Sequence, residues 1–281
     1  MIKVCLTHDV DRIRKSYQYL TKPYNALKVG NFPLFFKRLY ATVTLKNAYW
    51  GFDIIIEIEN KYQVKSTFFF LNESIKLDYR HPKLWPLALG RYQITEPKVR
   101  EIIRYLDRNG WEIGVHGSFR SYKNLELLRQ EKKDLEDVLG HAVIGIRQHH
   151  LNMNRWTWSY QREAGFLYDS SWGSNEESGF VDDRVDVFFP LEKSVFCEMP
   201  MTIMDVTFVD RKNKWEKLEE ILARLEKEGG YLVVNFHTSS FDEFDYPCYK
   251  ETYIRLIEFL GSKNARFMTM EQAYKEIMER E

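Results

Sequence analysis

The chain has 281 residues, 44% of them apolar and 15% aromatic, so it can fill the core of one large domain. Lys plus Arg equals Asp plus Glu at 41 each, and this balance favours neither nucleic acid nor an anionic membrane as a partner. The three cysteines, Cys5, Cys197 and Cys248, are widely spaced without a CxxC pair, which argues against a disulfide framework and a cysteine-rich zinc site. We expect a single domain over residues 1–281.

No segment has the pattern of a targeting or membrane-spanning sequence. A secretory signal needs an apolar stretch of roughly 7–15 residues, whereas the polar run THDVDR follows only a few apolar residues. The most apolar runs, such as STFFFL, are strand length and fall short of the roughly 18 residues of a membrane span. We therefore expect a cytoplasmic protein without membrane insertion.

Short apolar runs alternate along the chain with longer amphipathic runs. The predicted strands, in order, are IKVCLTH, VKSTFFFL, WEIGVHG, AVIGIRQ, GFLYDSS, YLVVNFH and ARFMTM. The predicted helices are FDIIIEIENKY, EPKVREIIRYLDRNG, NLELLRQEKKDLEDVLG, residues 155–164, residues 214–229, YKETYIRLIEFLGSK and a final helix. About seven βα repeats predict an α/β fold in which a parallel sheet is closed or partly closed into a barrel.

Two segments interrupt this alternation. Residues 12–50 carry many aromatic and basic side chains before the first repeat helix and are predicted to form a helical insertion or lid. Residues 172–208 are predicted to form a long loop with strand pairs rather than a helix. Neither segment shows a repeat or a low-complexity bias, so neither is expected to be a linker.

Polar side chains follow five of the predicted strands at the point where each strand ends. They are Asp9 and Asp11, His116, Arg147 with the pair His149 and His150, Asp169, and His237. In parallel α/β folds the carboxyl ends of the strands build the active site, so these side chains are expected to converge. Asp9 and Asp11, two residues apart on an extended chain, are expected to point to one side, with His8 on the other.

Each of these residues also has an ordinary structural explanation. An aspartate after a strand is commonly a turn residue or a helix N-cap, as Asp9 and Asp11 could be. His116 could be a hydrogen-bonded packing residue, and His237 could cap a turn. Arg147 and Asp169 could form a structural ion pair. The combination of all five strand ends favours a functional site over five separate structural roles.

The sequence resembles the NodB-homology polysaccharide deacetylases, also called carbohydrate esterase family 4, in the subset whose first motif is Asp-x-Asp. The matching stretches are LTHDVD, STFFFL, GWEIGVHGSFRS, GIRQHH, GFLYDSS and LVVNFHTSSF, which together span nearly the whole chain. The resemblance implies a distorted (β/α) barrel that binds one divalent metal ion, commonly zinc. It also implies removal of N- or O-acetyl groups from an acetylated carbohydrate.

The resemblance assigns metal ligands to particular positions. Asp11 resembles the metal-binding aspartate, and His116 resembles the first histidine of the second motif, also a ligand. The family usually has a second histidine four residues later, but this sequence has Arg120 there, and a guanidinium offers no lone pair. His149 is the favoured replacement, with His150, a serine such as Ser121, or water as the alternatives.

The resemblance also implies the catalytic roles. Asp9 resembles the general base, and Arg147 resembles the arginine beside it, which would keep the carboxylate ionised and aimed. Asp169 resembles an aspartate that orients this arginine or the base. His237 resembles the histidine that protonates the leaving group.

Two classes of function follow from these assignments. The first is a metal-dependent deacetylase acting on an acetylated sugar or polysaccharide precursor, in which the metal ion lowers the pKa of bound water to about 7. The second is a catalytically degenerate glycan-binding protein with the same fold, which the departure at Arg120 motivates. Hydrolysis of an amide or formyl group on a non-sugar substrate is a further alternative, and the oligomeric state stays open.

Overall fold

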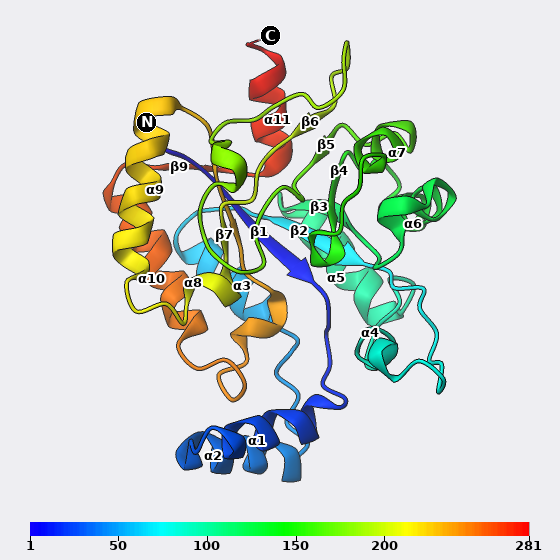
Figure 1. The fold of residues 1–281 in the computed structure, drawn as a ribbon, viewed down its shortest axis with the longest axis vertical. Coiled ribbons are helices and arrows are strands. Elements are labelled where there is room, and N and C mark those ends of the chain that lie inside the picture. The colour runs from blue at the N-terminus through cyan, green and yellow to red at the C-terminus, as the bar shows by residue number, and fades with distance from the viewer. Residues whose placement is uncertain (281) are drawn as a thin grey trace.

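The computed structural model describes residues 1–280, whose centre is an all-parallel sheet of nine strands (Figure 1). The strands are β1 (Lys3–Val10), β2 (Thr67–Leu71), β3 (Glu112–Gly117), β4 (Gly145–Gln148), β5 (Tyr168–Asp169), β6 (Cys197–Glu198), β7 (Ile203–Met204), β8 (Leu232–Asn235) and β9 (Arg266–Met268). Their order is β6-β5-β4-β3-β2-β1-β8-β7, and β9 pairs with β1. Within residues 1–280, the end strands β6 and β7 do not pair with each other, so the barrel is open there. This confirms the predicted distorted barrel.

The structure has two more strands than the seven predicted from the alternation of apolar runs. Both β6 and β7 come from the segment 172–208 and are two residues long. They pair in parallel with β5 and β8 rather than with each other. The short helix α8 (Asp205–Phe208) follows β7 directly and differs from the expectation of loop and strand only.

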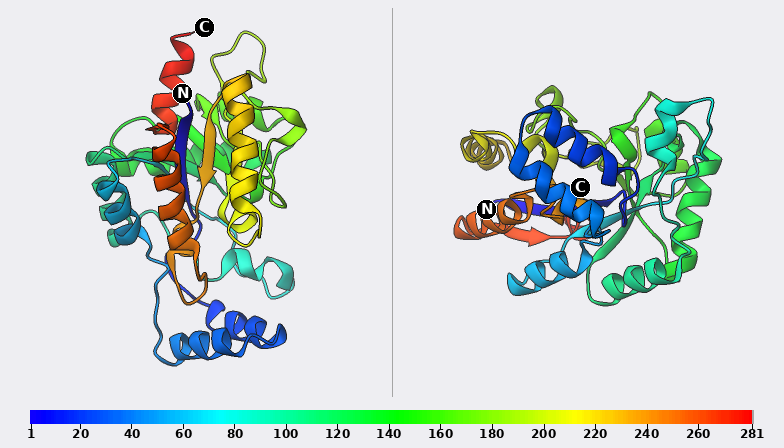
Figure 2. Two further views of the ribbon diagram at one scale, coloured as in Figure 1. Left: turned by 90° about the vertical axis from the view of Figure 1, so that its left-hand side faces the viewer. Right: turned by 90° about the horizontal axis from the view of Figure 1, so that it is seen from below.

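Helices cover the outer face of the curled sheet (Figures 1 and 2). The α-helices of residues 1–280, besides α8, are α1 (Gln18–Lys28), α2 (Phe32–Val43), α3 (Phe52–Lys61), α4 (Trp85–Ala88), α5 (Pro97–Arg108), α6 (Leu125–Leu139), α7 (Thr157–Glu163), α9 (Lys214–Glu228), α10 (Tyr249–Ser262) and α11 (Met270–Met278). Of these, α1 and α2 lie beyond the barrel rather than on the sheet (Figures 1 and 2). Helix α5 illustrates why the other helices pack on the sheet, since Val99, Ile102, Ile103 and Leu106 recur on one face and are buried. No helix in residues 1–280 is long and apolar enough to cross a membrane.

The alternation of side chains along β1 separates two layers of the core. Val4, Leu6 and Val10 belong to the cluster between the sheet and the helices, whereas Cys5 belongs to the cluster inside the barrel. Asp9 follows Cys5 at an even spacing, so it points into the barrel. Because all the strands are parallel, their carboxyl ends lie at one edge of the sheet, and the polar residues that end them gather there.

The segment 12–50 forms an antiparallel helical hairpin of α1 and α2 that extends from the barrel at the end of the long axis (Figure 1). Pro23 lies inside α1 and has no N–H to donate to the carbonyl of Tyr19, four residues earlier. The hydroxyl of Thr42 in α2 donates to that carbonyl at 2.7 Å instead. The carbonyl that proline leaves without a donor in α1 thus accepts from α2, and this bond links the two helices.

Candidate active site

Asp9 is a buried carboxylate held on both oxygens at the centre of the sheet. Arg147 Nη1 donates to Asp9 Oδ1 at 2.9 Å, and Asn235 Nδ2 donates to Asp9 Oδ2 at 2.8 Å. Burial acts to raise the pKa of Asp9, but the positive charges of Arg147, His116 and His237 outweigh it and lower the net pKa. The carboxylate is therefore ionised and fixed in direction.

Arg147 is fully buried at the end of β4 and is itself held by several acceptors. Its Nη1 also donates to Thr7 Oγ1 at 2.7 Å, and its Nε donates to the carbonyl of Ser170 at 2.9 Å. Its guanidinium lies 4.6 Å from the ring centroid of Phe69. A buried guanidinium with these partners cannot swing away from Asp9 without leaving unpaired donors.

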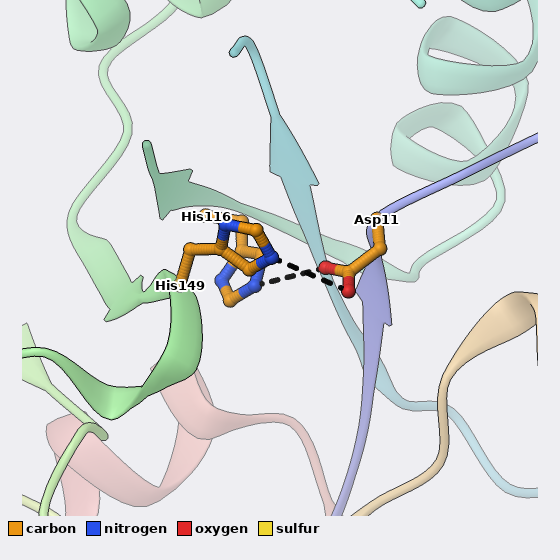
Figure 3. A group of neighbouring side chains, drawn as sticks. All are labelled: Asp11, His116 and His149. Atoms are coloured by element: carbon orange, nitrogen blue, oxygen red, sulfur yellow. Dashed lines mark ion pairs between the residues drawn. The ribbon is translucent and has the colours of Figure 1, made fainter. Parts of the chain in front are cut away.

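Asp11, His116 and His149 form the one group in residues 1–280 whose His, Cys, Asp or Glu ligand atoms lie close enough to hold a metal ion. One ligand atom from each lies within 4.8 Å of the other two, and the side chains point toward one another (Figure 3). His116 Nε2 is 3.2 Å from Asp11 Oδ1, and His149 Nε2 is 3.5 Å from Asp11 Oδ2. Ligands roughly 2.0–2.1 Å from a tetrahedral zinc ion stand about 3.3 Å apart, so these separations fit a shared ion.

The hydrogen bonds around the site also fit a metal ion. His116 Nδ1 is 2.9 Å from the carbonyl of Arg147, which can only accept, so Nδ1 carries the proton and Nε2 presents its lone pair toward Asp11. Asp11 Oδ1 is buried and accepts no well-aligned hydrogen bond. Burial raises the pKa of Asp11, but His149 and His116 hold the net pKa well below its usual range. A half-buried carboxylate that has one free, buried oxygen and stands beside two imidazoles is a suitable divalent-metal site.

Glu73 lies behind His149 on the side away from Asp11. Its Oε2 is 3.8 Å from His149 Nδ1 and accepts from the backbone N–H of Phe119 at 3.1 Å, while Oε1 accepts from the N–H of Ile75 at 3.0 Å. A carboxylate at Nδ1 orients a histidine that binds a metal through Nε2. Burial lowers the pKa of His149, but Asp11 and Glu73 raise the net pKa above its ordinary value, so protonation of His149 competes with binding of a metal ion.

The alternatives for the missing ligand have other surroundings. Arg120 is exposed and lines a shallow pocket with residues 74–78, so it lies outside the group of possible ligands. His150 has a left-handed backbone (φ 58°) and is exposed, and its ring is tilted by 42° against that of His149, with the centroids 4.3 Å apart. The Ser121 hydroxyl is engaged with the Ser118 carbonyl and the Gln148 side chain. Of these residues, His150 could bind a metal ion through its imidazole, and it is not in the group of close ligand atoms.

His237 follows β8 and is tied to Asp205, at the start of α8. Its Nδ1 lies 2.9 Å from Asp205 Oδ1, and its backbone N–H donates to Oδ2 at 2.9 Å. Burial acts to lower the pKa of His237, but Asp205, Asp11 and Asp9 raise the net pKa to about 10. His237 is therefore a cation at neutral pH, and it lies near enough to Asp9 and Asp11 for their charges to raise its pKa.

The side chain of Asp169 contacts residues other than Arg147 and Asp9, the two that it was predicted to orient. In residues 1–280 its side chain forms no hydrogen bond or ion pair with Arg147 or Asp9; Oδ1 instead accepts from Ser171 Oγ at 2.6 Å. Burial raises the pKa of Asp169 and that of the adjacent Glu198. Successive residues of a strand point to opposite sides, and it is Ser170 that touches Arg147, through its carbonyl and hydroxyl.

Three contributors to the site were not predicted from the sequence: Asn235, Asp205 and Glu73. Asn235 is a polar residue within the apolar run LVVNF, and Asp205 follows the apolar run PMTIM, so both carry the strand-end signal that identified the others. Glu73 follows STFFFL by one residue and carries the same signal. His8 lies on the far side of β1, where its Nε2 is 2.9 Å from Glu59 Oε1.

Comparison with known proteins gives matches in structure but not in sequence. No protein-family model matches the chain, and no curated protein matches its sequence. A crystal structure of a Mycobacterium smegmatis protein assigned as a polysaccharide deacetylase aligns with a TM-score of 0.60 at 18% identity, covering 99% of this chain and 91% of that one. Puue allantoinase aligns with a TM-score of 0.59 at 14% identity, over 98% and 89% of the two chains. These likenesses confirm the prediction at the level of the fold, which is a distorted, partly open (β/α) barrel.

Proposed function

We propose that this protein is a metal-dependent hydrolase that removes an acetyl group from an acetylated sugar or polysaccharide precursor. One observation carries the proposal: an ionised carboxylate, Asp9, is held rigidly beside a group of three metal-ligand side chains. His116 Nε2 lies 3.9 Å from Asp9 Oδ2 and 3.2 Å from Asp11 Oδ1, so base and ligands lie together at one edge of the sheet. A structural role for Asp9 alone would not need this neighbour.

The residues that would hold the metal ion are Asp11, His116 and His149. A divalent ion bound there polarises the acetyl carbonyl and lowers the pKa of a bound water. Zinc is the ion to test first, because two imidazoles and one carboxylate with open positions are a common catalytic zinc set.

The protein's own residues would divide the proton transfers between them. Asp9, ionised and fixed by Arg147 and Asn235, accepts a proton from the attacking water. His237, held protonated by Asp205, donates a proton to the nitrogen or oxygen that leaves the acetyl group. The acyl carbon thus gains an oxygen from water, its bond to the leaving atom breaks, and acetate is released.

The test is acetate release by purified, zinc-loaded protein from a panel of N- and O-acetylated sugars. We expect release by the wild type and its loss in Asp9→Asn, with zinc still bound. A protein that binds zinc but releases no acetate, while still binding an acetylated glycan, would instead be the degenerate glycan-binding protein. The likeness to an allantoinase adds a second candidate, hydrolysis of a carbon–nitrogen bond in a non-sugar substrate, and such substrates belong in the panel.

A further inference from the structure

The helical hairpin of α1 and α2 exposes an unusually apolar surface. Of eighteen large apolar side chains that are exposed in residues 1–280, ten lie between residues 20 and 45. They are Leu20, Tyr24, Leu27, Val29, Phe32, Phe36, Leu39, Tyr40, Val43 and Leu45, which we call the hairpin face. Exposed apolar residues scattered singly are ordinary, but so many on two short helices mark an interaction surface.

The apolar residues follow the helical repeat, so each helix carries them as a stripe. In α2, Phe32, Phe36, Leu39 and Val43 are spaced by four, three and four residues, which puts them on one side of the helix. Phe36 is 62% exposed and Val43 75% exposed. In α1, Leu20, Tyr24 and Leu27 have the same spacing. The helices pack on each other through small residues, Ala26 and Ala41, which leaves the large ones outward.

The charge of this segment is entirely positive. Residues 12–52 contain eight Lys and Arg residues and no Asp or Glu, although the whole chain is balanced. Lys28, Lys37 and Lys46 are exposed, and none of the three forms an ion pair within the described part of the chain. Apolar and aromatic residues on helices flanked by lysine are the composition of a segment that lies in the interface of an anionic bilayer.

The hairpin is attached firmly to the barrel and is placed where a flat surface can reach it. Lys15 forms ion pairs with Asp242 and with Asp245, and Arg38 donates to the carbonyl of Asp245 at 2.7 Å. Tyr49 donates to Asp245 Oδ2 at 2.9 Å. In two perpendicular views the hairpin forms the lower end of the molecule, beyond the barrel (Figures 1 and 2). A planar partner could therefore contact it without meeting the barrel.

We propose that the hairpin face docks the protein onto the surface of an anionic lipid bilayer. The apolar stripes enter the interfacial region of the bilayer, and the lysines lie at the level of the anionic headgroups. A second copy of the chain is a poorer partner, because a two-fold interface would bring these uniformly basic hairpins against each other. Docking here is peripheral, and it does not depend on the proposed deacetylase activity.

The experiment measures binding of the full chain to vesicles by co-sedimentation. Phosphatidylcholine vesicles are compared with vesicles that also contain phosphatidylglycerol, at low and at high salt. We expect binding to the anionic vesicles alone, weakened by salt. The Asp11→Ala variant is measured as well and should bind like the wild type, so failure of the metal site and failure of docking are distinguishable.

Two pairs of variants separate the apolar and the charged contributions. Phe36→Ser with Val43→Ser should weaken vesicle partitioning about tenfold or more, whereas the exposed residues Val195 and Val206, changed to serine, should not alter it. Lys28→Glu with Lys37→Glu should weaken it at least tenfold, because each basic residue near an anionic surface contributes roughly a fivefold factor. Lys212→Glu with Lys227→Glu is the matched control, since both lysines are exposed on other elements.

Three results would overturn the proposal. The first is no binding to either vesicle, and the second is equal binding to both. The third is a concentration-dependent dimer of the wild type, measured by sedimentation velocity, that disappears with Phe36→Ser while vesicle binding does not change. That last outcome would assign the hairpin face to a second copy of the chain.

Discussion

The edge of the sheet around Asp9 and the helical hairpin depart from the usual distribution of residues in opposite directions. Around Asp9, polar side chains such as Arg147 and His116 are buried, and each lies beside a carboxylate. On the hairpin, large apolar side chains such as Phe36 and Val43 are 62% and 75% exposed. Most of the chain follows the ordinary rule, with apolar residues inside and charged residues outside. The two exceptions are the proposed metal site and the proposed docking face.

The comparison also separates two kinds of stability. Replacing one residue of the buried ion pair between Arg147 and Asp9 leaves the other charge buried and unpaired, which destabilises the fold. Removing an exposed apolar side chain from the hairpin costs the fold little and affects only what binds there. If the buried polar residues around Asp9 serve metal binding and catalysis together, substitutions among them should have the effects below.

The largest effect is expected from Asp9→Asn. An amide cannot accept the proton from water, so acetate release should fall by about 10²–10⁴-fold, the usual contribution of a general base. Zinc binding should persist, because Asp9 is not one of the three ligands. A variant that keeps activity within tenfold of the wild type would remove Asp9 from the role of base.

Arg147→Met should destabilise the fold, because it leaves the Asp9 carboxylate buried and unpaired. We expect a loss of about 3–5 kcal/mol in the free energy of unfolding, measured in urea. Arg129→Met is the control: Arg129 is 44% exposed and pairs with Glu126 and Glu163 on the surface, so its loss should cost under about 1 kcal/mol. Equal losses in the two variants would contradict the pairing described around Asp9.

Glu73→Gln should weaken zinc binding by about 10–100-fold, since it removes the carboxylate that orients His149. Glu131→Gln is a matched control, because Glu131 is buried nearby and burial raises its pKa to about 8, so glutamine resembles its protonated form. Calorimetric titration with zinc measures both. If the two substitutions weaken binding equally, Glu73 has no specific part in the metal site.

Asp205→Asn should change the pH dependence of activity. His237 must be protonated to act as the acid, and Asp205 contributes most to raising its pKa to about 10 from an ordinary value of 6.5. Activity should therefore be lost as pH rises through about 10 in the wild type, and at lower pH in the variant. Asp205 also stabilises the fold through this pair: the contribution is complete below pH 6.5 and is lost as pH rises through about 10.

The control for this pH shift is Asp210→Asn, an exposed carboxylate in the same segment that accepts from Tyr249 and does not contact His237. It should leave the alkaline limb of the pH profile in place. An alkaline limb that stays in place for Asp205→Asn as well would show that His237 is not the acid.

The sequence predicted the parts of this structure that depend on local pattern. Apolar alternation located seven of the nine strands, and strand geometry placed Asp9 and Asp11 on the side away from His8. The sequence pattern did not show which residue at the end of β5 faces Arg147. Asp169 was expected there, and the structure has Ser170 in that contact instead. A strand of two residues is too short for its pattern to decide direction.

Contacts between distant segments were harder to predict from the sequence. Glu73 meets His149, and Asp205 meets His237, only because the curled sheet brings separate strand ends together. The basic character of the hairpin could not be read from the overall charge, because a total over 281 residues does not show where the charges lie. Both features became visible once residues were placed in space.

Zinc binding measured by equilibrium dialysis in the wild type, His149→Ala and His150→Ala tests the central claim most directly. The metal site we propose uses His149 in place of the histidine that the second motif lacks, with Asp11 and His116 as the other ligands. We predict one zinc ion per wild-type chain, retained in His150→Ala and lost in His149→Ala. Zinc retained at full occupancy and affinity in His149→Ala would contradict this metal site.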